Sequence, residues 1–142
     1  MSLTQLFLII HLFSIALLLG IGFSNIVGFR VAKGLGGEMA KGIAAHRESL
    51  IPYGDIVFVT IIASGLILLW GIGGGQGVSP WFHVKMAAVA IWAICYILMR
   101  LRIQKFLKVR DITLVARIRL FAHIAITAAT AALICAVMAF AA

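Results

Sequence analysis

Four long apolar runs, separated by polar segments, dominate the pattern of the chain. The runs cover residues 6–29, 51–70, 81–99 and 120–140. About 20 consecutive apolar residues suffice to cross the hydrocarbon core of a bilayer as an α-helix. The pattern predicts an all-α integral membrane protein, a single transmembrane domain over residues 1–142 that folds as an antiparallel four-helix bundle. Its helices are expected over about residues 4–30, 49–71, 80–105 and 112–141.

The composition agrees with a membrane protein and disfavours a soluble domain. Hydrophobic residues make up 64% of the 142 positions and charged residues only 11%, well below the usual charged share of about 25%. The first run has no basic segment before it, so it is interpreted as a helix and not as a cleaved signal. Cys95 and Cys135 each lie inside an apolar run, where we expect them to be small packing residues.

The basic residues are confined almost entirely to two segments. Residues 30–49 hold four of the 12 lysines and arginines and residues 100–119 hold seven, which leaves only Lys85. By the positive-inside rule these segments are cytoplasmic, so both termini face the periplasm or exterior. The distribution indicates a multi-pass protein of a bacterial inner membrane, in contact with anionic lipid, and it excludes nucleic acid as a partner.

The connecting segments differ in character. Glycines in "AKGLGGEMAKG" are expected to loosen the first cytoplasmic loop, and "GIGGGQGVSP" is expected to be a tight outer turn that ends at Pro80. The second basic segment either extends the flanking helices or lies along the headgroups. Gly20, Ser24 and Gly28 form a stripe of small residues that would let a neighbouring helix approach closely.

Ionisable and polar side chains form two clusters when their depth is counted along the helices. His11 and His83 lie about 8 Å and 3 Å inside the outer ends of the first and third helices. Ser14 shares the face of His11, whereas Lys85 lies roughly 200° around the helix from His83. We therefore expect an outer cluster of His11, Ser14 and His83, with Lys85 as a further candidate.

An inner cluster is expected near the cytoplasmic side. Asp55 enters the second helix at a depth similar to that of His123 in the fourth, with Asn25 nearby. Thr127 and Thr130 continue the polar stripe that begins at His123. Asp55 and His123 could act in proton transfer or in a quinone pocket, or they could form a structural pair that joins two helices.

The two histidines at similar depth suggest the axial ligation of a b-type haem. Histidine is a common haem ligand, and helical bundles hold such cofactors between facing helices. Lys85 or Trp81 could then contact a haem propionate. In the alternative interpretation, each histidine only forms a hydrogen bond between helices and Lys85 extends to the lipid headgroups.

Two segments resemble a known family. "WFHVKMAAVAIWAICYILMRLR", with Trp81, His83 and Lys85, is similar to the third helix of the HemJ-type bacterial protoporphyrinogen oxidases. "LFLIIHLFSIALLLGIGFSNIVGFR", from the histidine to the arginine at its end, resembles the first helix of that family. The wider group includes CopD-like copper-resistance membrane proteins, so the chain resembles a divergent member of this four-helix family.

The resemblance implies a haem-b protein that oxidises protoporphyrinogen IX and passes electrons to the respiratory chain. Apart from the resemblance, a quinone is the candidate electron acceptor. His11 and His83 would be the metal ligands, and Ser14, Arg30 and Lys85 would help to bind the cofactor or an acidic porphyrin. Asp55 and His123 are the candidate catalytic residues. The alternatives are a non-catalytic accessory subunit of a membrane complex and a CopD-like copper-handling protein. A homo-oligomer or a respiratory-chain partner is also compatible with the sequence.

Overall fold

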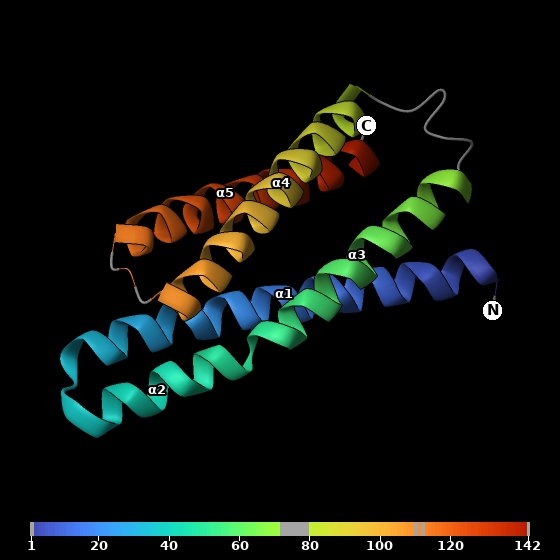
Figure 1. Cartoon of the computed structure of the whole chain (residues 1–142). Helices are drawn as coiled ribbons and strands as arrows, with labels where there is room; N and C mark the ends of the chain where they lie inside the picture. Colours follow the sequence, from blue (N-terminus) through green and yellow to red (C-terminus); the bar gives the residue numbers. More distant parts are fainter. Residues whose placement is uncertain (1, 72–79, 110, 112, 142) are drawn as a thin grey trace. The chain divides into compact units, whose positions relative to one another are not determined.

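The computed structural model describes residues 2–71, 80–109, 111 and 113–141, and within these ranges all regular structure is helical (Figure 1). The helices are α1 (Leu3–Gly34), α2 (Gly37–Ser49), α3 (Ile51–Gly71), α4 (Pro80–Val109) and α5 (Thr113–Ala141). Four helical stretches are long and apolar enough to cross a membrane: Leu3–Gly34, Gly37–Gly71, Pro80–Val109 and Thr113–Met138. The predicted helical class is thus confirmed, and so is the presence of four helices that could cross a membrane.

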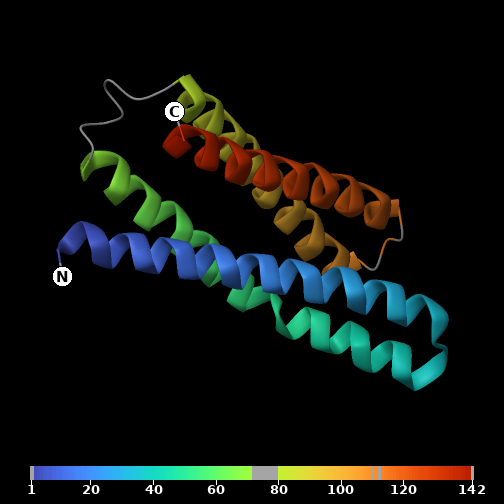
Figure 2. The same cartoon turned by 180° about the vertical axis from the view of Figure 1, so that it is seen from behind.

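The helices fall into two compact units, Met1–Gln76 and Gly77–Ala142, called here the first and the second unit. In the first unit α3 returns antiparallel beside α1, and α2 lies along the C-terminal part of α1 (Figures 1 and 2). The residues of α3 with little exposed surface recur every three or four positions: Gly54, Val57, Ile61 and Ser64. This spacing places them on one face of the helix.

The first basic segment is mainly helical, where the glycine-rich sequence predicted a loosened loop. Helix α1 extends to Gly34, and α2 begins at Gly37 after a short turn. Gly37 has a φ of 63°, a left-handed conformation that glycine adopts without steric cost. Pro52 lacks an N–H, so it cannot continue the hydrogen-bond pattern of α2, and α2 and α3 are separated at Leu50.

The glycine stripe of α1 supports close helix packing at only one of its two glycines. A Cβ atom added to Gly28 would lie 3.3 Å from Cδ of Arg47, whereas one added to Gly20 would have nothing within 4 Å. The expectation of a close approach along the whole stripe is therefore met at Gly28 and not at Gly20.

In the second unit α4 and α5 form an antiparallel pair with extensive contacts (Figures 1 and 2). Helix α4 begins at Pro80, as predicted, while residues 72–79 of the expected outer turn lie outside the described residues. Helices α4 and α5 extend through most of the second basic segment, which agrees with the expected helical extension. The buried residues of the pair are mostly small: Ala88, Trp92 and Cys95 on α4, and Leu114, Ala125, Ala128, Ala132 and Cys135 on α5.

A leucine at position 88 is expected to destabilise the protein, because a larger side chain would have to fit a buried position of α4. Overpacking a well-packed core costs about 1–3 kcal/mol. Ala87 is the matched control, since it is the preceding alanine of the same helix and is exposed. Unfolding in mixed micelles can be followed by circular dichroism. The unfolding midpoint should be lower for Ala88→Leu and almost unchanged for Ala87→Leu. Equal midpoints for the two variants would contradict this account of the packing.

The start of α5 is expected to loosen as the pH falls through the pKa of Asp111. The Asp111 carboxylate accepts hydrogen bonds from Oγ1 of Thr113 at 2.8 Å and from its backbone N–H at 2.9 Å. The pKa of Asp111 is lowered, mainly by the hydrogen bond from the Thr113 side chain and next by the bond from the Thr113 backbone. The positive charge of Lys105 lowers it more weakly. Because its unfolded pKa is roughly 4, the stabilisation is complete above that pH and is lost as the pH falls through the lowered pKa.

Amide hydrogen exchange at Thr113 measures this effect directly. The protection factor should fall in acid in the unsubstituted protein and stay nearly constant in Asp111→Asn, whose amide oxygen accepts the same bonds without titrating. If the protection factor fell equally in both proteins in acid, a group other than Asp111 would be responsible for the effect.

Candidate functional site

The first unit contains a hydrogen bond between side chains of two helices that are long and apolar enough to cross a membrane. His11 of α1 and Ser64 of α3 are joined by a distance of 2.9 Å between Nδ1 and Oγ. Both residues lie well inside apolar stretches, where ionisable side chains are costly and mark candidate functional sites. This pair fixes the imidazole of His11 relative to α3.

The contacts of Ser64 favour one of the two tautomers of His11. The hydroxyl of Ser64 has a single proton, and its shortest contact is 2.6 Å to the carbonyl oxygen of Thr60 one turn earlier. When that proton is donated to Thr60, Oγ accepts the hydrogen bond from Nδ1–H of His11. The neutral imidazole then carries its lone pair on Nε2, which is the atom that can bind a metal or accept a proton.

The packing around His11 depends on a residue without a side chain. A Cβ atom added to Gly65 would lie 3.2 Å from Cε1 of His11 and 3.7 Å from Nδ1. The imidazole therefore lies against the backbone of α3. Ser14, on the same face of α1 as His11, is buried and donates a hydrogen bond of 2.7 Å to the carbonyl oxygen of Ile10. Ser14 is thus satisfied by its own helix.

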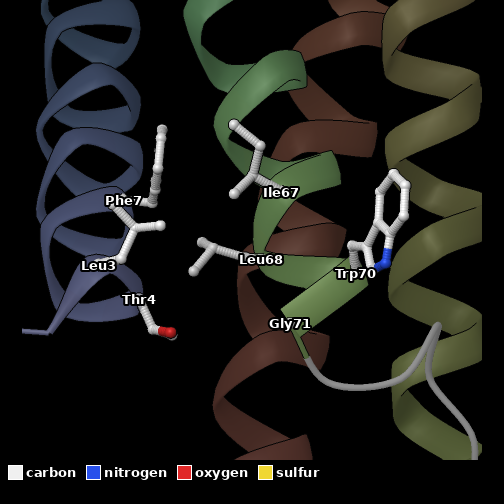
Figure 3. Close-up of a pocket in the computed structure, with 7 residues that line it drawn as sticks. All are labelled: Leu3, Thr4, Phe7, Ile67, Leu68, Trp70 and Gly71. Atoms are coloured by element: carbon white, nitrogen blue, oxygen red, sulfur yellow. The ribbon is translucent and has the colours of Figure 1, made fainter.

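An apolar recess of about 240 Å³ lies at the neighbouring end of the α1–α3 pair (Figure 3). Its lining residues are Leu3, Thr4, Phe7, Ile67, Leu68, Trp70 and Gly71. Phe7 comes one turn before His11 and points toward α3, while Trp70 lies on the side of α3 away from Phe7 (Figure 3). The recess can take a hydrocarbon group close to the His11 position.

Near the start of α4, His83 and Lys85 both interact with Phe82. The imidazole of His83 meets the Phe82 ring edge-on, with a centroid distance of 6.1 Å, and Nζ of Lys85 lies 5.7 Å from the centroid of the same ring. His83 is exposed and Lys85 is partly buried. His83 belongs to the second unit and His11 to the first, so the common haem site stays a prediction.

The residues predicted near the cytoplasmic side are also divided between the units. Asp55 is partly buried on α3 in the first unit, whereas His123 is exposed on α5 in the second. Thr127 and Thr130 donate hydrogen bonds to backbone carbonyl oxygens of their own helix, at 3.0 and 2.9 Å. The pairing of Asp55 with His123 accordingly stays a prediction.

Arg30 lies exposed near the C-terminal end of α1. A rise of 1.5 Å per residue places it about 28 Å from His11 along the helix. A ligand held at His11 would therefore have to extend across most of the bilayer to reach Arg30.

Sequence reasoning missed Ser64 and Gly65 as partners of His11. A signal was present, since Ser64 precedes the end of α3 by seven positions and His11 follows the start of α1 by eight. In antiparallel helices of this kind, nearly equal counts from neighbouring ends indicate nearly equal depth.

Comparison with known protein families, curated proteins and solved structures finds no match. Within the described ranges, no three histidine, cysteine or acidic side chains are close enough together to hold a metal ion. A haem requires fewer protein ligands than such a cluster provides, so the geometry of His11 is the relevant test of a haem site.

Proposed function

We propose that the chain is a multi-pass protein of the bacterial inner membrane that binds haem b and acts in electron transfer. In this proposal the two units pack as one antiparallel four-helix bundle, with both termini on the periplasmic side. The basic segments at the ends of the apolar helices support this orientation. The resemblance to the HemJ-type oxidases supports protoporphyrinogen IX as the electron donor and a quinone as the acceptor.

The observation that carries the proposal is the hydrogen bond between His11 and Ser64. Histidines that bind metals commonly donate their second ring N–H to a neighbouring acceptor, which fixes the tautomer and the orientation of the ring. Ser64 is placed to accept from Nδ1, and Nε2 is left as the nitrogen with the lone pair. His11 therefore fits the role of an axial haem ligand.

The other residues have separate roles in this proposal. His83 would hold the haem iron together with His11, and the partly buried Lys85 would provide a cation for a propionate. A bound haem supplies one-electron redox chemistry between its ferric and ferrous states. Asp55 and His123 exchange protons on the cytoplasmic side, where Arg30 attracts acidic ligands.

The test is a difference spectrum of the protein purified in detergent from haem-replete cells. Dithionite-reduced minus air-oxidised protein should show b-type absorption, and a pyridine haemochrome assay on the same sample should give about one haem per chain. Oxidation of protoporphyrinogen IX is then assayed with and without a quinone. A colourless protein from haem-replete cells would rule the proposal out.

A non-catalytic accessory subunit is the second candidate. It is favoured by the polar residues satisfied within their own helices, namely Ser14, Thr127 and Thr130. This candidate predicts a colourless protein that tolerates alanine at positions 11 and 83. Copper bound to the colourless protein would instead favour the CopD-like function.

A further inference from the structure

Arg47 of α2 contacts three residues of α1, namely Asn25, Gly28 and Phe29. Its Nε donates a hydrogen bond of 3.3 Å to Oδ1 of Asn25, and its guanidinium carbon lies 5.4 Å from the centroid of the Phe29 ring. Between these two residues, the side-chain stem of Arg47 passes over Gly28, where an added Cβ would lie 3.3 Å from Cδ. The guanidinium is thus held in one orientation by a hydrogen bond, a ring and a glycine.

Asn25 is itself held in place. Its Nδ2 donates a hydrogen bond of 3.1 Å to the carbonyl oxygen of Ile21, one turn earlier in α1. This bond turns Oδ1 toward Arg47 and defines the amide orientation. Arg47 is consequently positioned by a residue that is already fixed, which reduces the conformational entropy lost when a ligand binds.

The two terminal nitrogens of Arg47 are available for a ligand. Within the described ranges, the hydrogen bond of Arg47 uses Nε. An arginine has five N–H donors, so four remain on Nη1 and Nη2. These donors form the fork that binds phosphate or carboxylate oxygens in pairs.

The position of Arg47 along the membrane normal suits the layer of lipid phosphates. Helix α3 has 21 residues, and at 1.5 Å each they span about 31 Å, close to the thickness of a hydrocarbon core. Arg47 precedes the start of α3 by four residues, which places it about 6 Å beyond the core. Arg30 and Lys33 are exposed at the same end of the first unit and add positive charge.

We propose that Arg47, positioned by Asn25, Gly28 and Phe29, is a binding site for a phosphate group at the membrane boundary. This group is either the phosphate of a lipid headgroup or a free inorganic phosphate ion. Two parallel N–H···O bonds from Nη1 and Nη2 hold its oxygens, while the Phe29 ring covers one face of the guanidinium. This site is independent of haem binding and lies at the opposite end of α1 from His11.

Native mass spectrometry of the detergent-purified protein, titrated with phosphatidylglycerol, tests the site. Arg47→Gln should weaken the tightest bound lipid about tenfold or more, the effect of losing charged hydrogen bonds. Arg47→Lys keeps the positive charge but loses the paired N–H donors of the guanidinium. Its lipid affinity should therefore lie between that of the unsubstituted protein and that of Arg47→Gln. Lys41→Gln is the matched control, because Lys41 is an exposed cation of the same helix and is already paired with Glu38. Equal lipid affinity in Arg47→Gln and the unsubstituted protein would overturn the proposal, as would equal losses in Arg47→Gln and Lys41→Gln.

A parallel titration with inorganic phosphate separates the two sources. Phosphate that binds in the absence of lipid, and competes with phosphatidylglycerol, identifies a free phosphate site. Binding of the intact lipid without competition identifies a headgroup site.

Solid-state NMR gives a measurement that does not depend on a folded Arg47→Gln protein. Dipolar dephasing of the guanidinium nitrogens by lipid phosphorus should appear in the unsubstituted protein in phosphatidylglycerol bilayers. The same signal should be absent from Arg47→Lys. Identical dephasing in both proteins would show that other arginines produce the signal and would overturn the proposal for Arg47.

Discussion

His11→Ala is expected to accumulate as a folded membrane protein without the b-type absorption of the unsubstituted protein. This expectation rests on the proposed function. The imidazole would be the ligand on α1, and alanine offers no atom that can replace Nε2. Ser64 retains its backbone hydrogen bonds to Thr60 and Ile61 in the variant, so no buried hydroxyl is left unsatisfied. Reduced-minus-oxidised spectra and the pyridine haemochrome assay measure the loss.

Ser64→Ala separates the ligand from the residue that orients it. Loss of such an orienting partner typically lowers metal affinity by about 10–100-fold, so Ser64→Ala should bind haem weakly in a titration and not lose it altogether. His83→Ala should also lower the haem content, because it removes the second proposed ligand. This graded series is expected for ligation and not for a general effect on folding.

The control for this series is His46→Ala. His46 is an exposed histidine of α2, and its replacement removes an imidazole without touching α3. It should leave haem content unchanged. Full haem occupancy in His11→Ala would exclude His11 as a ligand, and an equal loss in His46→Ala would indicate a non-specific effect of histidine removal.

The membrane spans could be predicted from the sequence because they depend on one local property. Apolar runs of sufficient length must form helices in a bilayer, since all backbone polar groups have to be satisfied within the segment. The second span was expected over residues 49–71 and α3 extends over Ile51–Gly71. Here hydrophobicity alone was sufficient.

Helix α2 could not be predicted in the same way. Its interior contains Gly42, and a glycine there weakens a helix by about 1 kcal/mol relative to alanine. The contacts that Arg47 and Ile43 make with α1 at Gly28 offset this weakness. Such contacts involve residues distant in sequence, so a reading of local propensity gives a loop.

The sequence predicted the ionisable residue of the candidate site, His11, but not the residues that contact it, Ser64 and Gly65. His11 is conspicuous because a histidine in an apolar run is costly. Ser64 is not conspicuous in the sequence, because a serine in an apolar helix can donate its hydrogen bond to a backbone carbonyl oxygen one turn earlier. Ser14 does this in α1. Which serine meets His11 depends on the rotation and the depth of two helices, and these are properties of the packed pair.

Gly65→Leu is expected to destabilise the first unit and to displace the imidazole of His11. Even a methyl group at this position would lie 3.2 Å from Cε1 of His11, and the remaining leucine atoms would have to occupy the space between α1 and α3. Overpacking of this kind costs about 1–3 kcal/mol. It should also disturb the hydrogen bond between His11 and Ser64, because a displaced ring changes the 2.9 Å distance between Nδ1 and Oγ.

Gly20→Leu is the matched control for this prediction. Gly20 is also a glycine of an apolar membrane helix, but an added Cβ there would have nothing within 4 Å. Both variants gain the same side chain and the same helix propensity, so a difference between them reports contact with the neighbouring helix. Unfolding in mixed micelles should give a lower midpoint for Gly65→Leu only, and the ¹⁵N resonances of the His11 ring should shift only in that variant. Equal midpoints and unchanged His11 resonances in both would show that α1 and α3 do not pack closely at this position, and the orientation of His11 would then have to be set by other contacts.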